Sequence, residues 1–396
     1  MTGHLLRLVW HRKRSNALVV VEIFCSFLVL SAVTTLGTFL LDNYLSPIGY
    51  AWKDVWDVRI GSGTREEGEA QGQGPATFQR LLQEARGFDE VVAAAGSFSV
   101  PYDTSTSISS YDHPPVTTEI NWATDELAEV LGLELERGRW FEPADTARQW
   151  QPVVLDADLA RQLFGDADPL GQVPPTDIDA QTPTRVVGVL REFRKSGELA
   201  AKGNYRFERV RLDRPGEDLP RNLLLKLRPG TGAAFEPRLL ERLQRVAPDW
   251  SFEIRPLEQM RRTQLRLRLA PLLVGCVVAG FLLLMVALGL IGVLWQNVTQ
   301  RTREFGLRRA TGAAGRDVRR QVLIELLLMT ALGLVLGTLV VAQVPLLHWF
   351  DGVGPKIWIG GVLGSALGML LLAAACGLYP SWLATRIRPA EALHYD

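Results

Sequence analysis

The sequence predicts an integral membrane protein that is α-helical in the membrane and carries a large α+β domain outside it, and three observations support this fold class. Four stretches contain no Asp, Glu, Lys or Arg and are about as long as the roughly 20 residues that a helix needs to cross a bilayer. They are Ile23–Leu41, Leu269–Trp295, Leu326–Phe350 and Ile357–Thr385. The segment between the first two stretches alternates strand and helix patterns, and the charges of the short connections fit one topology. We therefore expect four spans in a one-plus-three layout and an external domain of two lobes.

Positive charge predicts the orientation of the first span. Residues 1–16 contain four cations and no acidic residue, which predicts a cytoplasmic amino terminus. The first span, 17–43, is longer than the roughly 7–15-residue apolar core of a signal peptide, so we expect it to be retained. The segment 44–266 then lies outside the cytoplasm.

The same rule places the remaining spans. The connection 297–321 carries seven arginines against Glu304 and Asp317, so we expect it in the cytoplasm. The resulting layout has spans at 267–296, 322–350 and 357–383, an external loop at 351–356 and a cytoplasmic tail at 384–396.

The external segment contains two strand–helix–strand patterns, one near each end. The first runs from a strand at Asp54–Ile60 through a helix starting at Thr77 to a strand at Val91–Ser97. The second has a strand at Leu223–Leu227, a helix at Phe235–Val246 and a strand at Ser251–Leu257. Two such units can form one split sheet with helices on one side. We expect them to build one lobe, at about 50–116 and 220–257, with the second lobe inserted at about 117–219.

The external segment lacks the residues of a catalytic or metal site. Its one histidine is His113, and no HExxH, GxSxG or CxxC pattern occurs. The three cysteines, Cys25, Cys276 and Cys376, all fall in predicted spans, so we expect no disulfide in the external domain. We therefore expect no catalytic, cofactor-binding or metal-binding residues in this chain, no enzymatic activity of its own and no nucleic-acid partner.

The most specific stretch lies in the predicted cytoplasmic connection. Residues 301–313 read Arg-Thr-Arg-Glu-Phe-Gly-Leu-Arg-Arg-Ala-Thr-Gly-Ala, followed by Arg-Asp-Val at 316–318. This stretch resembles the cytoplasmic signature of the MacB/FtsX family of transporter permeases. The pattern of residues 379–395 and that of residues 153–171 with 186–189 are also similar to the family, so the resemblance covers essentially the whole chain.

The resemblance implies a transporter permease; some members of the family carry a fused ATPase domain, and this sequence departs from them. The resemblance also implies an external domain made of a porter-like lobe and an inserted lobe, and a dimer, homomeric or mixed, in a bacterial inner membrane with both termini in the cytoplasm. The chain contains no GxxxxGK[ST] phosphate loop. We therefore expect ATP and Mg²⁺ to be bound by a separate cytoplasmic ATPase, whose hydrolysis moves the external domain and drives export or efflux. A periplasmic adaptor and an outer-membrane channel are further partners that the resemblance implies.

The physical character of the connection fits a contact with that ATPase. Phe305 and Leu307 are apolar points among cations, and Gly312 can end a short helix, so the segment can sit in a groove of a partner. The alternative is a positively charged anchor that touches anionic headgroups. The residues expected to couple to the ATPase are Arg301, Arg303, Glu304, Phe305, Gly306, Arg308, Arg309 and Gly312.

Glycines four apart in the last two spans predict close helix packing. The pairs are Gly333 with Gly337 and Gly364 with Gly368, and small residues at this spacing let helices approach closely, within the chain or at a dimer seam. Lipid surrounds the outer faces of these spans.

Other functions remain open on the sequence alone. One is an FtsX-like regulatory adaptor that activates a periplasmic partner without transport. Another is a lipoprotein-extracting permease, and a third is a membrane-anchored binding protein without ATP coupling, for which changes in residues 301–313 would leave any ATPase unaffected.

Overall fold

The computed structural model describes residues 13–61, 74–112, 115–177, 183–212, 219–300, 315–347 and 353–384. The chain divides into two compact units. The membrane unit comprises Met1–Asp42 and Leu269–Asp396, and the soluble unit comprises Asn43–Arg268. Each unit is described by itself.

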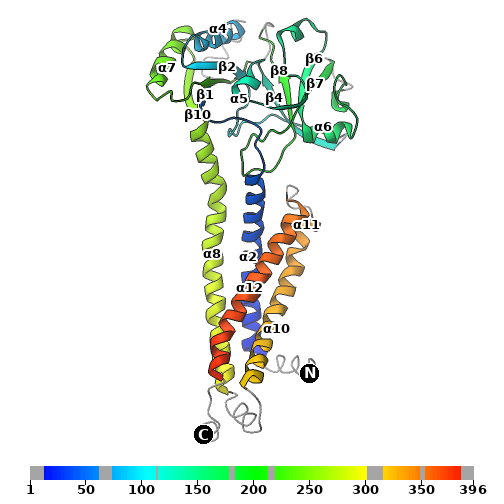
Figure 1. Ribbon diagram of the computed structural model, residues 1–396, viewed down its shortest axis with the longest axis vertical. Coiled ribbons are helices and arrows are strands. Elements are labelled where there is room, and N and C mark those ends of the chain that lie inside the picture. Colours follow the sequence, from blue (N-terminus) through cyan, green and yellow to red (C-terminus); the bar gives the residue numbers. More distant parts are fainter. Residues whose placement is uncertain are drawn as a thin grey trace. The chain divides into compact units, whose positions relative to one another are not determined.

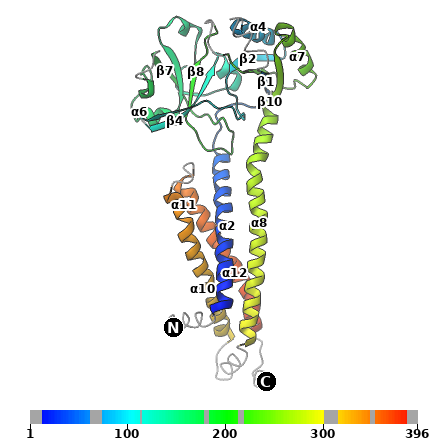
Figure 2. The ribbon, with the colours of Figure 1, turned by 180° about the vertical axis from the view of Figure 1, so that it is seen from behind.

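Four helices are long and apolar enough to cross a membrane, as the sequence predicts (Figure 1). They are α2 (Lys13–Leu45), α8 (Leu257–Gln300), α10 (Gly315–Val341) and α12 (Pro355–Ala384), and the short helix α11 (Gln343–Leu346) follows α10. The helices α10 and α12 lie side by side in both views (Figure 2). An apolar core that includes Ile23, Phe27, Leu290 and Leu326 holds the membrane unit together.

The soluble unit is built on one ten-stranded mixed sheet among the described residues, in the order β10-β1-β9-β2-β4-β8-β6-β7-β5, with β3 paired to β4. The strands are β1 (Val55–Gly61), β2 (Val91–Ser97), β3 (Ile108–Asp112), β4 (Pro115–Ala123), β5 (Leu135–Gly138), β6 (Gln151–Asp156), β7 (Thr184–Leu190), β8 (Tyr205–Arg209), β9 (Asn222–Leu227) and β10 (Ser251–Pro256). The helices are α4 (Gly74–Arg86), α5 (Leu127–Leu131), α6 (Ala157–Phe164) and α7 (Phe235–Val246).

The first lobe consists of β10, β1, β9 and β2 with α4 and α7, which pack against each other (Figure 1). The apolar residues of α4 recur at helical spacing, and Phe78, Leu81, Leu82 and Ala85 are all buried. They join Leu239 and its neighbours on α7 and the residues of β1, β9 and β2 in one apolar cluster. This is the split sheet with helices on one side that the two strand–helix–strand patterns predict.

The two lobes share both the sheet and an apolar core. The sheet passes from one lobe to the other where Ser97 of β2 pairs with Ala123 of β4. A second cluster takes Leu224 from the first lobe together with Val154 and Phe207 from the other. The apolar contacts therefore continue across the boundary between the lobes.

Three strands and one helix start differ from the sequence interpretation. In the inserted lobe the sequence pattern predicts strands at Thr117–Ile120, Pro152–Asp156 and Arg185–Leu190, which lie in β4, β6 and β7. The short strands β3, β5 and β8 have no counterpart in the sequence interpretation. Of these, β3 and β5 carry mostly exposed or polar residues and lack an apolar alternation. Leu257, read as the end of the last strand, is the first residue of α8 and is 0% exposed. An apolar residue that begins a buried helix turn looks the same in sequence as one that ends a strand.

Candidate functional site

The segment expected to contact an ATPase lies outside the described residues. All eight of its predicted coupling residues fall within 301–314, between the end of α8 at Gln300 and the start of α10 at Gly315. The same holds for the carboxyl-terminal pattern from residue 385 onward. The coupling role of these residues stays a prediction.

The predicted packing glycines differ in their surroundings. Gly333 lies against Ile23 of α2, and a Cβ at Gly337 would overlap the ring of Phe27 on α2. Among the described residues, Gly364 on α12 has no heavy atom within 4 Å of the position that its Cβ would take, and Gly368 meets only Leu30 at 4.0 Å. The first pair thus permits close packing of α10 on α2 inside the chain, whereas Gly364 faces away from the helices of its own chain.

Close helix approaches also occur at glycines that the sequence reading did not select. Gly361 on α12 lies directly against Thr35 of α2, and the Thr34 hydroxyl donates a hydrogen bond to the Gly361 carbonyl at 2.9 Å. Gly289 on α8 makes room for the carboxylate of Glu22. Neither glycine has another glycine four positions away, so a search for paired glycines does not find them.

A cleft in the soluble unit lies between the two lobes. It has a volume of about 280 Å³. One side is formed by Gln79, Gln83 and Arg86 of α4, and the other by residues of the inserted lobe. The latter are Thr124, Asp125, Glu126, Thr146, Arg209, Val210, Arg211 and Leu212.

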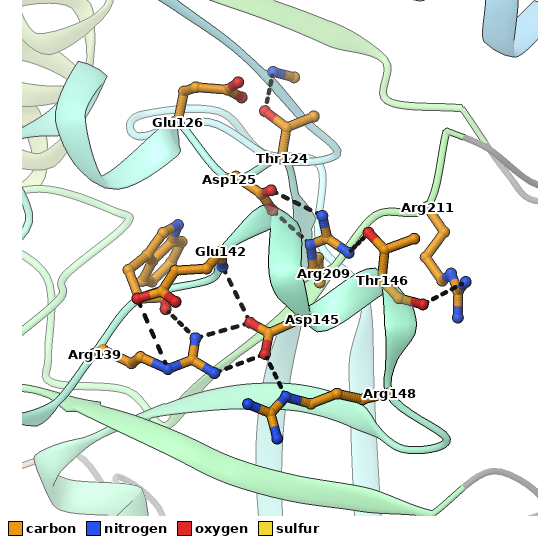
Figure 3. Close-up of polar contacts among 12 residues, drawn as sticks. Thr124, Asp125, Glu126, Arg139, Glu142, Asp145, Thr146, Arg148, Arg209 and Arg211 are labelled. Atoms are coloured by element: carbon orange, nitrogen blue, oxygen red, sulfur yellow. Dashed lines mark hydrogen bonds and ion pairs between the residues drawn. The ribbon is translucent and has the colours of Figure 1, made fainter.

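Ion pairs fix both walls of the cleft. Arg209 donates two hydrogen bonds to the carboxylate of Asp125, at 2.6 and 2.8 Å, and a third to the Thr146 hydroxyl at 2.8 Å (Figure 3). Arg86 reaches across the boundary to Glu126, with 2.8 Å between the charged groups. The charges that line the cleft are thus largely compensated by their neighbours.

A second cluster of charges supports the wall that carries Thr146. The carboxylate of Asp145 accepts hydrogen bonds from Arg139 at 2.6 and 2.8 Å and from Arg148 at 3.1 Å (Figure 3). Burial alone would raise the pKa of Asp145, but the hydrogen bonds from Arg139 and from the Glu142 backbone outweigh it and hold the pKa below its usual value. Asp145 therefore stays ionised and fixes the loop.

Paired charges dominate the chemistry of the cleft and of the cluster beside it. Each carboxylate named above is bound to an arginine, so none is placed as a general base. Within the described parts of the chain, no group of three His, Cys, Asp or Glu side chains could hold a metal ion. The sequence reading did not find this cleft, because its walls come from separate segments of the chain, at residues 79–86, 124–126, 146 and 209–212.

Comparison with known proteins identifies the family. Residues 17–235 match the MacB-like periplasmic core domain, and residues 276–389 match the FtsX-like permease C-terminal region. The macrolide export ATP-binding/permease protein MacB of Agrobacterium fabrum is 26% identical over 98% of this chain and 59% of its own length. The protein of the same name from Neisseria gonorrhoeae is 26% identical over 75% of this chain and 47% of its own. The chain thus spans about half the length of these relatives.

Solved structures include similar folds. The periplasmic region of MacB from Actinobacillus actinomycetemcomitans covers 56% of this chain and 96% of its own, with 17% identity and a TM-score of 0.37. The extracellular domain of the transporter YknZ from Gram-positive bacteria covers 50% of this chain, with 18% identity and a TM-score of 0.34. With both family regions matched in order along one polypeptide, the chain belongs to the MacB/FtsX-like family of ABC transporter permeases.

Proposed function

We propose that this chain is the permease subunit of an ATP-driven transporter and that it carries movement from a cytoplasmic ATPase to its periplasmic domain. Its action would export or expel cargo from the periplasm. The proposal places both termini in the cytoplasm and the protein in a bacterial inner membrane, as a homodimer or a dimer with a related permease. A periplasmic adaptor and an outer-membrane channel complete the proposed path.

The observation that supports the proposal most strongly is the continuity of α8. Pro256 ends β10, and Leu257, buried in the soluble core, begins a helix that continues to Gln300. No loop separates the sheet from the span. Apart from the one backbone hydrogen bond that Pro271 cannot make, α8 is a continuous helix. Such a helix resists bending more than a loop does, so a movement at its far end can reach the sheet.

The ATPase is proposed as a separate chain or domain that contacts residues 301–313. Relatives named as ATP-binding/permease proteins match this chain over about half of their length. The arginine-rich segment with Phe305 and Leu307 supplies the contact. The cation-only anchor remains the competing interpretation of that segment, and the experiment below separates the two.

The test is purification of the chain from its native membrane in a mild detergent, followed by identification of bound proteins and an assay of ATP hydrolysis. We expect a nucleotide-binding subunit to accompany the chain. Glu304→Lys and Phe305→Ala should uncouple hydrolysis from transport and leave expression unchanged. Glu241→Lys is the matched control, because Glu241 forms an exposed pair with Arg245 on α7, away from α8.

Three outcomes would contradict the proposal. Absence of any ATP-hydrolysing partner, under conditions that keep the assembly intact, would favour a membrane-anchored binding protein. Unchanged coupling in both variants of residues 304 and 305 would return that segment to the role of a charged anchor. Recovery of a periplasmic hydrolase with no transported cargo would instead favour a regulatory adaptor.

A further inference from the structure

A loop of the inserted lobe is more buried than loops usually are. It connects β7 to β8 at residues 191–204 and is called the junction loop below. Within it, Phe193–Lys195 and Gly197–Ala200 are buried. Connecting loops normally run over the surface, where water satisfies their backbone groups. The junction loop therefore needs other partners, and the structure shows which segments supply them.

The first partner is the end of α2. Arg194 is 1% exposed, and its guanidinium donates hydrogen bonds to the Asn43 carbonyl at 2.7 Å, to Asn43 Oδ1 at 2.9 Å and to the Ser46 carbonyl at 3.3 Å. The last carbonyls of a helix lack partners within it and carry partial negative charge. A buried arginine from a loop far along the sequence thus caps the helix.

The backbone after α2 lies directly on the same loop. The Arg194 N–H donates to the Ile48 carbonyl at 3.0 Å. Gly49 has φ +82°, and a Cβ there would overlap the Glu192 carbonyl. A residue with a side chain cannot take this position without moving one segment away from the other.

The second partner is the start of α8. The Nε–H of Arg261, in the second turn of α8, donates to the carboxylate of Glu198, which is 8% exposed. The Arg261 guanidinium also lies 4.3 Å from the centre of the Trp52 ring, on the segment that follows α2. One turn further, Gln264 donates to the Tyr102 carbonyl at 3.0 Å, and the Tyr102 N–H donates to the Lys195 carbonyl of the junction loop at 2.7 Å.

The junction loop thus contributes a cation, Arg194, to the end of α2 and a carboxylate, Glu198, to the start of α8. These two places, where the chain passes between a membrane helix and the soluble unit, are called the crossings below. Buried charges cost more than apolar side chains unless they are fully bonded, so packing alone does not require Arg194 and Glu198. Their directed hydrogen bonds fix the geometry of both crossings relative to the sheet. We propose that the junction loop ties the end of α2 and the start of α8 to the inserted lobe. Arg194 and Glu198 are then the positioning residues through which movement of the spans reaches the soluble domain, a role that rests on the proposed function.

The experiment is hydrogen–deuterium exchange of the full chain in its purified complex, with and without ATP and vanadate. We expect Arg194→Met and Glu198→Gln to speed exchange at least about tenfold, at residues 43–50 and 257–264 respectively. Exchange in β9 should stay at the wild-type rate, which shows that the fold persists. Arg191→Gln is the matched control, because this arginine of the same loop forms only an exposed pair with Glu134.

Coupling is the readout that a merely structural contact would not change. The wild-type complex should show ATP-dependent exchange changes in the soluble unit, and these should be lost in the Glu198→Gln variant while ATP hydrolysis continues. The double substitution Glu198→Arg with Arg261→Glu, which reverses the ion pair, should restore at least part of the ATP-dependent change in hydrogen exchange.

Each contrary result has a distinct meaning. Unchanged exchange at both crossings, or an intact ATP response in both single variants, would overturn the role of the junction loop. If the wild-type complex binds no ATPase and shows no response, the proposed function fails, while the exchange at 43–50 and 257–264 still tests whether the loop holds the two crossings.

Discussion

Replacing Gly337 and Gly364 by leucine should give opposite results, because the structure gives the two glycines different neighbours. A Cβ at Gly337 would overlap the Phe27 ring, whose Cε1 lies at 3.1 Å, and Phe27 is 0% exposed. Added bulk in a packed interior typically costs about 1–3 kcal/mol. The better helix propensity of leucine returns at most about 1 kcal/mol. We expect Gly337→Leu to lower the free energy of unfolding by about 1–2 kcal/mol, close to a tenfold change in the folding equilibrium.

A Cβ at Gly364 would have no heavy atom of the described chain within 4 Å, so we expect the free energy of unfolding of Gly364→Leu to be unchanged or slightly raised. The assay is unfolding of each purified variant in mixed micelles of increasing SDS content, followed by tryptophan fluorescence. Equal destabilisation by both substitutions would refute the packing argument. A Gly364→Leu variant of normal stability that no longer forms the oligomer would place Gly364 at a contact with another chain.

Three further predictions concern the soluble unit and α8. Burial raises the pKa of both Asp156 and Asp57 from 3.8 to about 7. Because the folded state keeps these protons and the unfolded chain loses them, the free energy of unfolding should fall by about 1–3 kcal/mol as pH rises from about 4 to about 7. Asp156→Asn should flatten that pH dependence, measured by chemical denaturation. Asp125→Asn breaks the paired hydrogen bonds to the mostly buried Arg209 and should lower the free energy of unfolding by about 1–3 kcal/mol in the same assay. The control is Asp158→Asn, which breaks an exposed ion pair; an equal loss in both variants would contradict the prediction. Pro271→Ala should slow hydrogen exchange several-fold near position 271 of α8, because alanine restores a backbone N–H that proline lacks. Unchanged exchange rates would contradict this prediction.

The membrane layout and much of the external sheet follow from the sequence. Spans are readable because a charge-free stretch long enough to cross a bilayer has few other uses. The helix at Phe235–Val246 appears with its predicted bounds, because its apolar residues recur at helical spacing. The sequence does not predict strand β8, because its charged residues Arg206 and Glu208 alternate with buried aromatic residues. Arg206 can be buried because it donates hydrogen bonds to Asp177, at 2.6 and 2.7 Å, and Asp177 lies in a distant loop.

The candidate sites also differ in whether local sequence patterns predict them. Close packing at Gly333 and Gly337 could be inferred locally, since glycines four apart mark one face of a helix. The cleft between the lobes and the contacts of Arg194 could not. An arginine in a loop reads as a solvated charge, and only the folded chain brings Asn43 and Glu198 to its two sides. Long-range pairing of charges leaves no periodic trace in the sequence.

The place of β1 in the sheet also constrains how the protein is made. Strand β1 pairs only with β9 and β10 in the described structure, and Asp57 of β1 bonds to Arg255 of β10, 198 positions later. During synthesis, β1 emerges first but has no partner strand until residues 222–256 have followed it. Almost the entire periplasmic segment must therefore cross the membrane before β1 can be enclosed between its two partner strands, and such long-range closure is slow. Since α8 starts at the next residue, the sheet is completed only as the second span is being delivered.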